Sequence, residues 1–170
     1  MKPAKSKKGD HPPKRSGDAK KSTGPEYRNR RAFFEYVILE KVEAGLVLMG
    51  SEVKSIRGGQ INLSDSYARV SDGEVHLVNC HIAEYKNAGA FGHEPLRARK
   101  LLLKRAEIRK LEKRTEEKGL TVIPLRLYFS ARGIAKVELG IGKGKQHGDK
   151  RQATKERELD REIRREMSRY

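Results

Sequence analysis

The chain has 170 residues, which is enough for one domain with unstructured ends and too few for two full domains. Lys and Arg together number 39 against 23 acidic residues, giving a formal net charge of +16. A polyanionic partner is therefore favoured over a small acidic substrate. The single cysteine, Cys80, excludes a disulfide framework and a cysteine-based zinc site. No stretch approaches the roughly 18 to 20 consecutive apolar residues that span a bilayer, and no secretion signal is visible, so we expect a cytoplasmic protein without membrane contact.

The positive charge is concentrated at the ends of the chain. Residues 1–31 carry 11 basic and 3 acidic side chains, and their Lys, Pro, Gly and Ser content cannot bury a core. We expect a disordered basic extension over residues 1–28, although for residues 1–24 a merely solubilising tail is an equally good explanation. The predicted division is this extension, a folded domain over residues 29–141 and a basic tail over residues 142–170.

The first predicted elements of the domain are a strand and a short helix. The aromatic and β-branched run of residues 33–39 predicts a buried strand. Residues 43–45 predict that the chain reverses its direction and continues as a second extended run over residues 46–48. A short helix should follow, with Ser51 as its N-cap and a Gly-Gly pair at residues 58–59 as its end.

Turn residues then predict a hairpin and a loop. The runs 65–70 and 74–79 are joined by Ser-Asp-Gly, a sequence that is typical of the turn of a β-hairpin. Residues 87–95 contain two glycines and a proline without periodicity and predict a loop.

The last elements are a long helix and a second hairpin. Apolar residues at helical spacing predict a helix over residues 101–118, ended by Gly119. Alternating patterns over 125–129 and 135–141 predict two strands, and Pro124 argues for an edge position or a bulge. The fold prediction is mainly β, an OB-like six-stranded antiparallel barrel with a short and a long helix.

Enzyme motifs are absent from the sequence. There is no phosphate loop ending in Gly-Lys-Ser/Thr, no Gly-x-Ser-x-Gly elbow and no carboxylate cluster at metal spacing. Cys80 and His81 are neighbours in a predicted strand and would point to opposite faces, which is poor geometry for a catalytic dyad. We expect no enzyme, no cofactor and no metal.

A local basic cluster could bind phosphates. Arg97, Arg99 and Lys100 lie within four residues, shortly after His93. With Lys54, Arg57 and Gln60 they could line one side of the barrel and pair with an RNA backbone. A solvated charged face explains the same residues equally well.

The C-terminal tail has the pattern of a helix. Leu159, Ile163 and Met167 follow one another at four-residue steps, with ion pairs at helical spacing between them. Such a helix is marginal alone in water, so we expect it to fold on a partner. A helix packed permanently on the barrel is the alternative.

Five blocks of the sequence occur in a characteristic order. They are Asn29-Arg30-Arg31, the run from Glu43 to Arg57 that contains Gly50-Ser51-Glu52-Val53-Lys54, Asn62-Leu63-x-Asp65-Ser66-Tyr67, Arg97-x-Arg99-Lys100-Leu101-Leu102-Leu103, and Asp149-Lys150-Arg151. Together these blocks resemble the SmpB family, the SsrA-binding proteins of bacteria. The resemblance covers about residues 29–165. It implies a protein that binds the tRNA-like domain of transfer-messenger RNA and delivers it to stalled ribosomes for trans-translation, which tags the nascent peptide.

The resemblance also implies two sets of site residues. The RNA-binding set on the barrel is Asn29, Arg30, Arg31, Glu43, Lys54, Arg57, Gln60, Asn62, His93, Arg97, Arg99, Lys100 and Lys136. The set in the tail, for the decoding site and message channel of the ribosome, is Lys143, Lys145, His147, Asp149, Lys150, Arg151, Lys155 and Arg157. Since a carboxylate cannot attract a phosphate, Glu43 should accept hydrogen bonds from a base or orient a neighbouring cation.

The implied partners are transfer-messenger RNA, the small-subunit decoding site with its ribosomal RNA, the elongation factor that carries aminoacyl-tRNA, and alanyl-tRNA synthetase. We expect a monomer.

The chain departs from the family at one motif. Members usually carry Tyr or His directly before Asp-Lys-Arg, whereas here Gly148 stands there and His147 one place earlier. The segment before Asn29 has no counterpart in the family.

Two other functions are compatible with a basic barrel. A ribosomal or assembly protein would bind ribosomal RNA permanently through the same features. A nuclease would need clustered acidic residues for metal binding, and none are visible.

Overall fold

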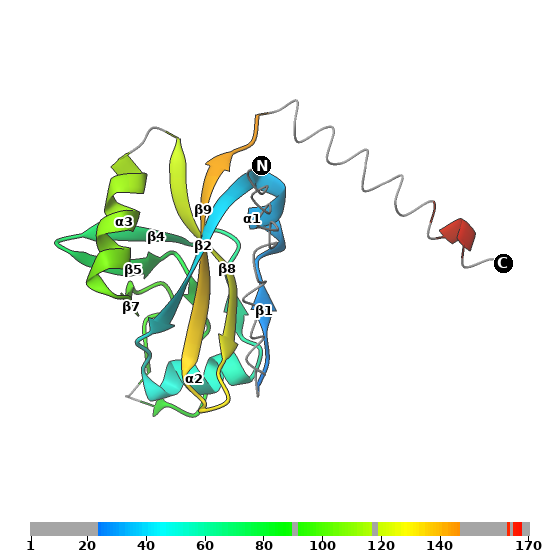
Figure 1. The fold of residues 1–170 in the computed structure, drawn as a ribbon. Helices are drawn as coiled ribbons and strands as arrows, with labels where there is room; N and C mark the ends of the chain where they lie inside the picture. The colour runs from blue at the N-terminus through cyan, green and yellow to red at the C-terminus, as the bar shows by residue number, and fades with distance from the viewer. Residues whose placement is uncertain (1–23, 90–91, 117–118, 147–162, 164, 168–170) are drawn as a thin grey trace, which may run out of the picture.

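The computed structural model describes residues 24–89, 92–116, 119–146, 163 and 165–167. The expectations for residues 1–23 and for the tail side chains of His147, Asp149, Lys150, Arg151, Lys155 and Arg157 lie outside these ranges. The elements are, in chain order, β1 (Tyr27–Arg28), α1 (Arg30–Glu35), β2 (Tyr36–Leu46), α2 (Gly50–Arg57), β3 (Ile61–Asn62), β4 (Tyr67–Ser71), β5 (Glu74–Val78), β6 (His81–Ile82), β7 (Arg99–Leu102), α3 (Arg105–Glu116), β8 (Leu120–Phe129) and β9 (Ala135–Gly144) (Figure 1). The fold is mainly β. None of the helices within the described ranges is long and apolar enough to cross a membrane.

The main sheet closes on itself. Its strand order is β1-β8-β4-β5-β7-β2-β9, and β9 pairs again with β8. Six strands thus form a ring of antiparallel pairings, with β1 added to β8. A separate two-stranded sheet joins β3 to β6. Closing the ring removes the free strand edges that an open sheet would present to solvent.

Two apolar clusters lie on the two faces of β8. Val122, Leu127 and Phe129 belong to the large cluster, which also receives Leu139 and Ile141 from β9. Ile123 and Leu125 belong to a smaller cluster with Ala32 of α1. Because α1 covers one face and the ring encloses the other, β8 is apolar nearly throughout instead of alternating. Two alternatives were predicted at Pro124, an edge position or a bulge, and the register of β8 with β9 shifts between Pro124 and Arg126, as the second alternative requires.

The prediction of a buried strand over residues 33–39 is wrong. Phe33 lies in α1, which begins because the Asn29 side chain accepts a hydrogen bond from the Ala32 amide at 3.1 Å. The strand begins at Tyr36, and Val37 and Leu39 are 48% and 61% exposed. The predicted reversal at residues 43–45 is also wrong, since β2 continues through Leu46.

The short helix is confirmed but its predicted cap is wrong. Met49 is the N-cap of α2, and its amide donates to the Glu52 carboxylate at 2.6 Å. Ser51 lies inside the helix and its hydroxyl contacts His93 instead. The predicted end at residues 58–59 is confirmed, and Gly59 has a φ of +82° that suits glycine.

The first hairpin is confirmed as β4 and β5, with positive φ at both Asp72 and Gly73. The second is confirmed as β8 and β9. The long helix begins later than predicted, at Arg105. Leu101, which fits a helical face by its spacing, lies in β7 and is 2% exposed because it packs inside the ring.

The ordered domain is longer at both ends than the predicted 29–141. Tyr27 and Arg28 form β1 against β8. At the other end β9 continues through Gly144, so Lys143 belongs to the sheet, where it is opposite Val37 on one side and Leu120 on the other. The Lys145 amide then donates to the Glu35 carbonyl at 2.8 Å. Residues 142–144, which were predicted to belong to the tail, are therefore part of β9.

Two glycines of β9 offer a matched test of this packing. A Cβ on Gly140 would lie 2.9 Å from Cδ1 of Leu125, a buried side chain, whereas a Cβ on Gly144 would meet nothing within 4 Å. We expect Gly140→Ala to lower the free energy of unfolding by about 1–3 kcal/mol through overpacking. Gly144→Ala should leave it nearly unchanged, and urea unfolding of both variants checks this. Equal effects at the two positions would contradict the close approach of Leu125 to β9.

Candidate nucleic-acid interface

Glu52 is the centre of a buried polar cluster between α2 and the segment before β7. Its side chain is fully buried. Its Oε1 accepts from Nε of Arg97 and Nε of Arg99, both at 2.8 Å, and its Oε2 accepts from Arg97 at 2.5 Å as well as from the Met49 amide. One carboxylate thus holds two arginines and the N-terminus of a helix.

Arg99 uses the rest of its guanidinium to bind main-chain carbonyls. It is 0% exposed and donates to the carbonyls of Cys80, Arg97 and Pro95. A buried guanidinium is tolerated only when its donors are matched in this way. The prediction that Arg99 contacts RNA phosphates is therefore wrong, because the side chain is enclosed by protein.

His93 and Asn29 are also structural residues in this arrangement. His93 is 4% exposed and its ring nitrogens contact the Ser51 hydroxyl at 2.9 Å and the Ile82 carbonyl at 3.1 Å. Asn29 is 2% exposed, caps α1 and donates to the carbonyls of Leu63 and Pro124. Their predicted direct contact with RNA is corrected for the same reason as that of Arg99.

Opposing effects set the pKa of Glu52. Burial raises it, but the hydrogen bonds from Arg97, the Met49 amide and Arg99 together outweigh burial, and the pKa lies below its ordinary value. Burial also raises the pKa of the Cys80 thiol to about 11, so this cysteine stays protonated. With His81 exposed and Cys80 buried, the two side chains do not form a dyad.

The exposed face of α2 carries two cations over aromatic rings. Nζ of Lys54 lies 5.1 Å from the centroid of Tyr85, and the guanidinium of Arg57 lies 5.4 Å from that of Phe129. Such contacts orient a cation while leaving its donors available to a ligand. Gln60 follows α2 and is exposed.

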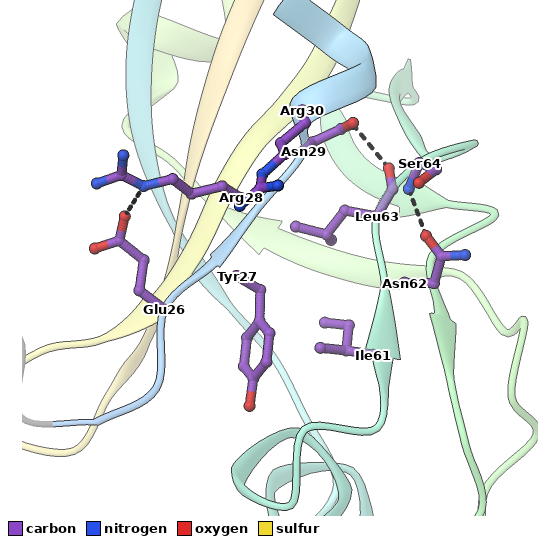
Figure 2. Close-up of a pocket in the computed structure, with 9 residues that line it drawn as sticks. All are labelled: Glu26, Tyr27, Arg28, Asn29, Arg30, Ile61, Asn62, Leu63 and Ser64. Carbon is purple, nitrogen blue, oxygen red and sulfur yellow. Dashed lines mark hydrogen bonds and ion pairs between the residues drawn. The ribbon is translucent and has the colours of Figure 1, made fainter. Parts of the chain in front are cut away.

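A groove with a volume of about 520 Å³ lies between the segment from Glu26 to Arg30 and the segment from Ile61 to Ser64 (Figure 2). Arg28 pairs with Glu26 at its edge, and Arg30 is exposed. The Asn62 side chain accepts from the Ser64 amide at 2.8 Å. The lining of the groove therefore combines two cations, Arg28 and Arg30, with polar groups and the side chain of Tyr27.

Glu43 and Lys136 meet on the outer face of β2 and β9. Nζ of Lys136 donates to Oε1 of Glu43 at 2.6 Å, and the Tyr128 hydroxyl donates to Oε2. Burial and the bond to Glu43 raise the pKa of Tyr128 to about 12. The carboxylate thus orients a neighbouring cation, one of the two roles expected for it. A groove of about 790 Å³ includes Glu43, Lys136 and Lys104 in its lining.

Arg31 and Lys100 are exposed and form ion pairs. Arg31 contacts Glu35 at 2.8 Å and Asp65 at 2.6 Å, and Lys100 pairs with Glu74. The structure joins Glu43 with Lys136, while Lys54 and Arg57 of α2 contact the rings of Tyr85 and Phe129. Sequence reasoning did not give Glu52 a role, although its place three residues after the helix start has the spacing of a capping box.

No group of three His, Cys, Asp or Glu side chains that could hold a metal occurs in the ranges that the structure covers.

Comparison with known proteins identifies the family. The family model described as "SmpB protein" matches residues 26–169. The chain belongs to the SmpB family. Its relatives include the "SsrA-binding protein" of Anaeromyxobacter sp. (strain Fw109-5), 57% identical over 141 residues, which are 83% of this chain and 85% of the relative. That of Symbiobacterium thermophilum is 50% identical over 149 residues, 88% of this chain and 94% of the relative.

A solved SmpB-family structure has the same fold. A chain of "tmRNA-SmpB: a journey to the center of the bacterial ribosome" superposes with a TM-score of 0.63 at 48% identity, covering 73% of this chain and 87% of that one. The ring of strands and the buried Glu52 cluster thus belong to an SmpB domain.

The contacts of Glu52 predict how the free energy of unfolding depends on pH. Glu52→Gln keeps the shape but leaves Arg99 buried without its counter-charge, so we expect a loss of about 3 kcal/mol at neutral pH. Because folding lowers the pKa of Glu52, its stabilisation is full above the ordinary value of 4.5 and is lost as the pH falls below it. Unfolding measured from pH 7 to pH 3 should therefore show the difference between the two proteins shrinking at the acid end.

Glu74→Gln is the matched control, since Glu74 also accepts from a cation but is exposed. It should change stability little at any pH. A loss as large as that of Glu52→Gln would show that burial is not the cause.

Proposed function

We propose that this chain binds the tRNA-like domain of transfer-messenger RNA and delivers it to stalled ribosomes for trans-translation. The observation that carries this is membership of the SmpB family, whose relatives named SsrA-binding protein share 50–57% identity over most of the chain. The excess of basic side chains supports an RNA partner.

The ring of six strands fits an OB-type barrel as the platform for this RNA. Such barrels bind oligonucleotides on their strands and loops. The exposed and half-buried residues of the predicted set are the proposed contacts: Arg30, Arg31, Glu43, Lys54, Arg57, Gln60, Asn62, Arg97, Lys100 and Lys136. Arg97 reaches the surface with 24% of its side chain exposed while Glu52 holds it in place. Asn29, His93 and Arg99 support these contacts from inside.

The C-terminal tail is the proposed ribosome-reading part. Asp149, Lys150 and Arg151, with His147, Lys155 and Arg157, would enter the decoding site and message channel and become helical there. Lys145 lies where this tail begins, directly after β9. Elongation factor and alanyl-tRNA synthetase would act through the RNA, and the protein would work as a cytoplasmic monomer.

Titration of the tRNA-like domain at physiological salt, with excess bulk tRNA as competitor, tests the RNA partner. We expect tight binding that survives the competitor. The double variant Lys54→Gln and Arg57→Gln should bind about tenfold more weakly, with a shallower dependence on salt, because two phosphate contacts are removed. Binding erased by the competitor would instead favour a ribosomal or assembly protein, which would co-sediment with all ribosomes at near unit stoichiometry.

A truncated protein tests whether the barrel binds the RNA while the C-terminal tail acts on the ribosome. Because β9 ends at Gly144 and the Lys145 amide binds Glu35, the chain should be cut after Gln146 so that the sheet is intact. The truncated protein should bind the tRNA-like domain as the full chain does and fail to support tagging in a reconstituted translation system. Loss of RNA binding with an unchanged unfolding transition would show that the tail also holds the RNA.

A further inference from the structure

Apolar side chains are exposed at the end of the barrel where β2 begins and β9 ends, away from α2 (Figure 1). Val37 and Leu39 are 48% and 61% exposed, whereas the residues that alternate with them pack against the small apolar cluster on the other face. Val37 is opposite Lys143 of β9, and Lys143 is opposite Leu120 of β8, so these side chains project to one side. We call Val37, Leu39 and Leu120 the apolar end patch.

The surroundings of the apolar end patch indicate what could cover it. Lys143 is exposed at its edge, and no carboxylate in the part of the chain that the structure describes pairs with it. Single exposed apolar residues are common, but adjacent ones favour an interaction site. A fitting partner presents apolar side chains with negative charge beside them. A phosphate backbone has no apolar surface to offer, so RNA is a poor fit.

The C-terminal tail carries a surface of this kind. Its described residues are helical, and Ile163 and Met167 are 44% and 76% exposed. Leu159 precedes Ile163 by the same four-residue step, so the three side chains form one apolar stripe on a helix. Asp160 and Glu166 lie three residues before and after Ile163 and therefore border the stripe. The stripe thus combines apolar side chains with acidic edges.

The basic side chains of the same helix lie on its other side. Arg161 and Arg165 are two residues before and after Ile163, a spacing that places them on the opposite face. The acidic edges would repel phosphates and attract Lys143, whereas the arginines would do the reverse. The stripe is therefore suited to the barrel, and the arginine face to solvent or RNA.

The chain is long enough for the stripe to return to the apolar end patch. Gly144 is paired with Tyr36, so the tail starts next to Val37. Residues 146–155 provide a linker of about 35 Å when extended. A helix over residues 156–167 is about 18 Å long, shorter than that linker. Because the helix is tethered, its local concentration at the patch is high, and a small contact area suffices.

We propose that, in the free protein, residues 156–167 form a helix that docks its apolar stripe on the apolar end patch of the same chain, with its acidic edge beside Lys143. The contact holds the arginine face outward and must be released before the tail enters a message channel. This inference goes beyond the proposed function and does not depend on it, since it concerns the protein before any RNA is bound.

A spin label near the end of the tail tests the contact by NMR on the free full-length protein. Cys80, the one cysteine, is buried and the pKa of its thiol is raised to about 11, so Ser168→Cys provides a single reactive site. Ser168 is next to the stripe in sequence but not on its face. We expect the amide signals of the apolar end patch to lose most of their intensity and those of α2 to keep theirs.

Two pairs of variants in the labelled protein test which side chains make the contact. Ile163→Gln with Met167→Gln should restore the patch signals, whereas Arg161→Gln with Arg165→Gln, on the other face of the helix, should not. Gln retains helix propensity in both. On the barrel, Leu39→Gln should restore the remaining patch signals. Ile134→Gln, at a site 52% exposed and outside the patch, should leave them broadened.

Three results overturn the proposal. They are patch signals that keep their intensity, a loss that is equal at α2, and a loss that survives Ile163→Gln with Met167→Gln. A mixture of spin-labelled protein with isotope-labelled protein that lacks the spin label gives a fourth. Signal loss in that mixture shows a contact between two copies and assigns the patch to a second molecule. Failure of the proposed function appears separately, in the titration of the tRNA-like domain.

Discussion

The buried pair of Glu52 and Arg99 is the constraint on which the arrangement of the surface depends. Glu52 is on a helix and Arg99 begins a strand 47 residues later, so their contact fixes α2 against the ring. Neither charge can be removed alone without leaving the other desolvated, which makes the pair a condition of the fold more than a source of stability. The cations that face solvent, Arg97 and Lys54, take their positions from this pair.

The same principle divides the basic residues of the domain into two kinds. Some cations are satisfied inside, as Arg99 is by three carbonyls and a carboxylate. Others stay at the surface and lie over an aromatic ring, as Arg57 does over Phe129 and Lys54 over Tyr85. Only the second kind can replace bound water with phosphate oxygens at a low cost in free energy, because its N–H donors do not form hydrogen bonds to the protein. Net charge alone does not distinguish the two kinds.

Local chemistry in the sequence predicted the hairpins, since Asp72-Gly73 specifies its turn without help from the rest of the chain. The break before Tyr36 was missed because Phe33 and Phe34 favour a strand, while the Asn29 cap that starts α1 also depends on Leu63 and Pro124 far along the chain. Leu101 was assigned to a helix because its spacing fits one, although burial in the ring decides for a strand. For the site, exposed cations on α2 were predictable from pattern. The burial of Arg99 was not, since its partner Glu52 is distant in sequence.

The pairing at the end of β9 also fixes the point from which the C-terminal tail leaves the sheet. This point is the origin for the reach of the tail. Gly144 is opposite Tyr36, and the amide of Lys145 is held by Glu35, so a change in chain length beyond them cannot be absorbed within the sheet. Relative to the usual family motif, Gly148 separates His147 from Asp149 by one residue. One residue of extended chain spans about 3.5 Å, close to the distance between stacked bases. Because this origin is fixed, the greatest distance that a later residue can reach from the sheet is set by the number of residues between it and Lys145.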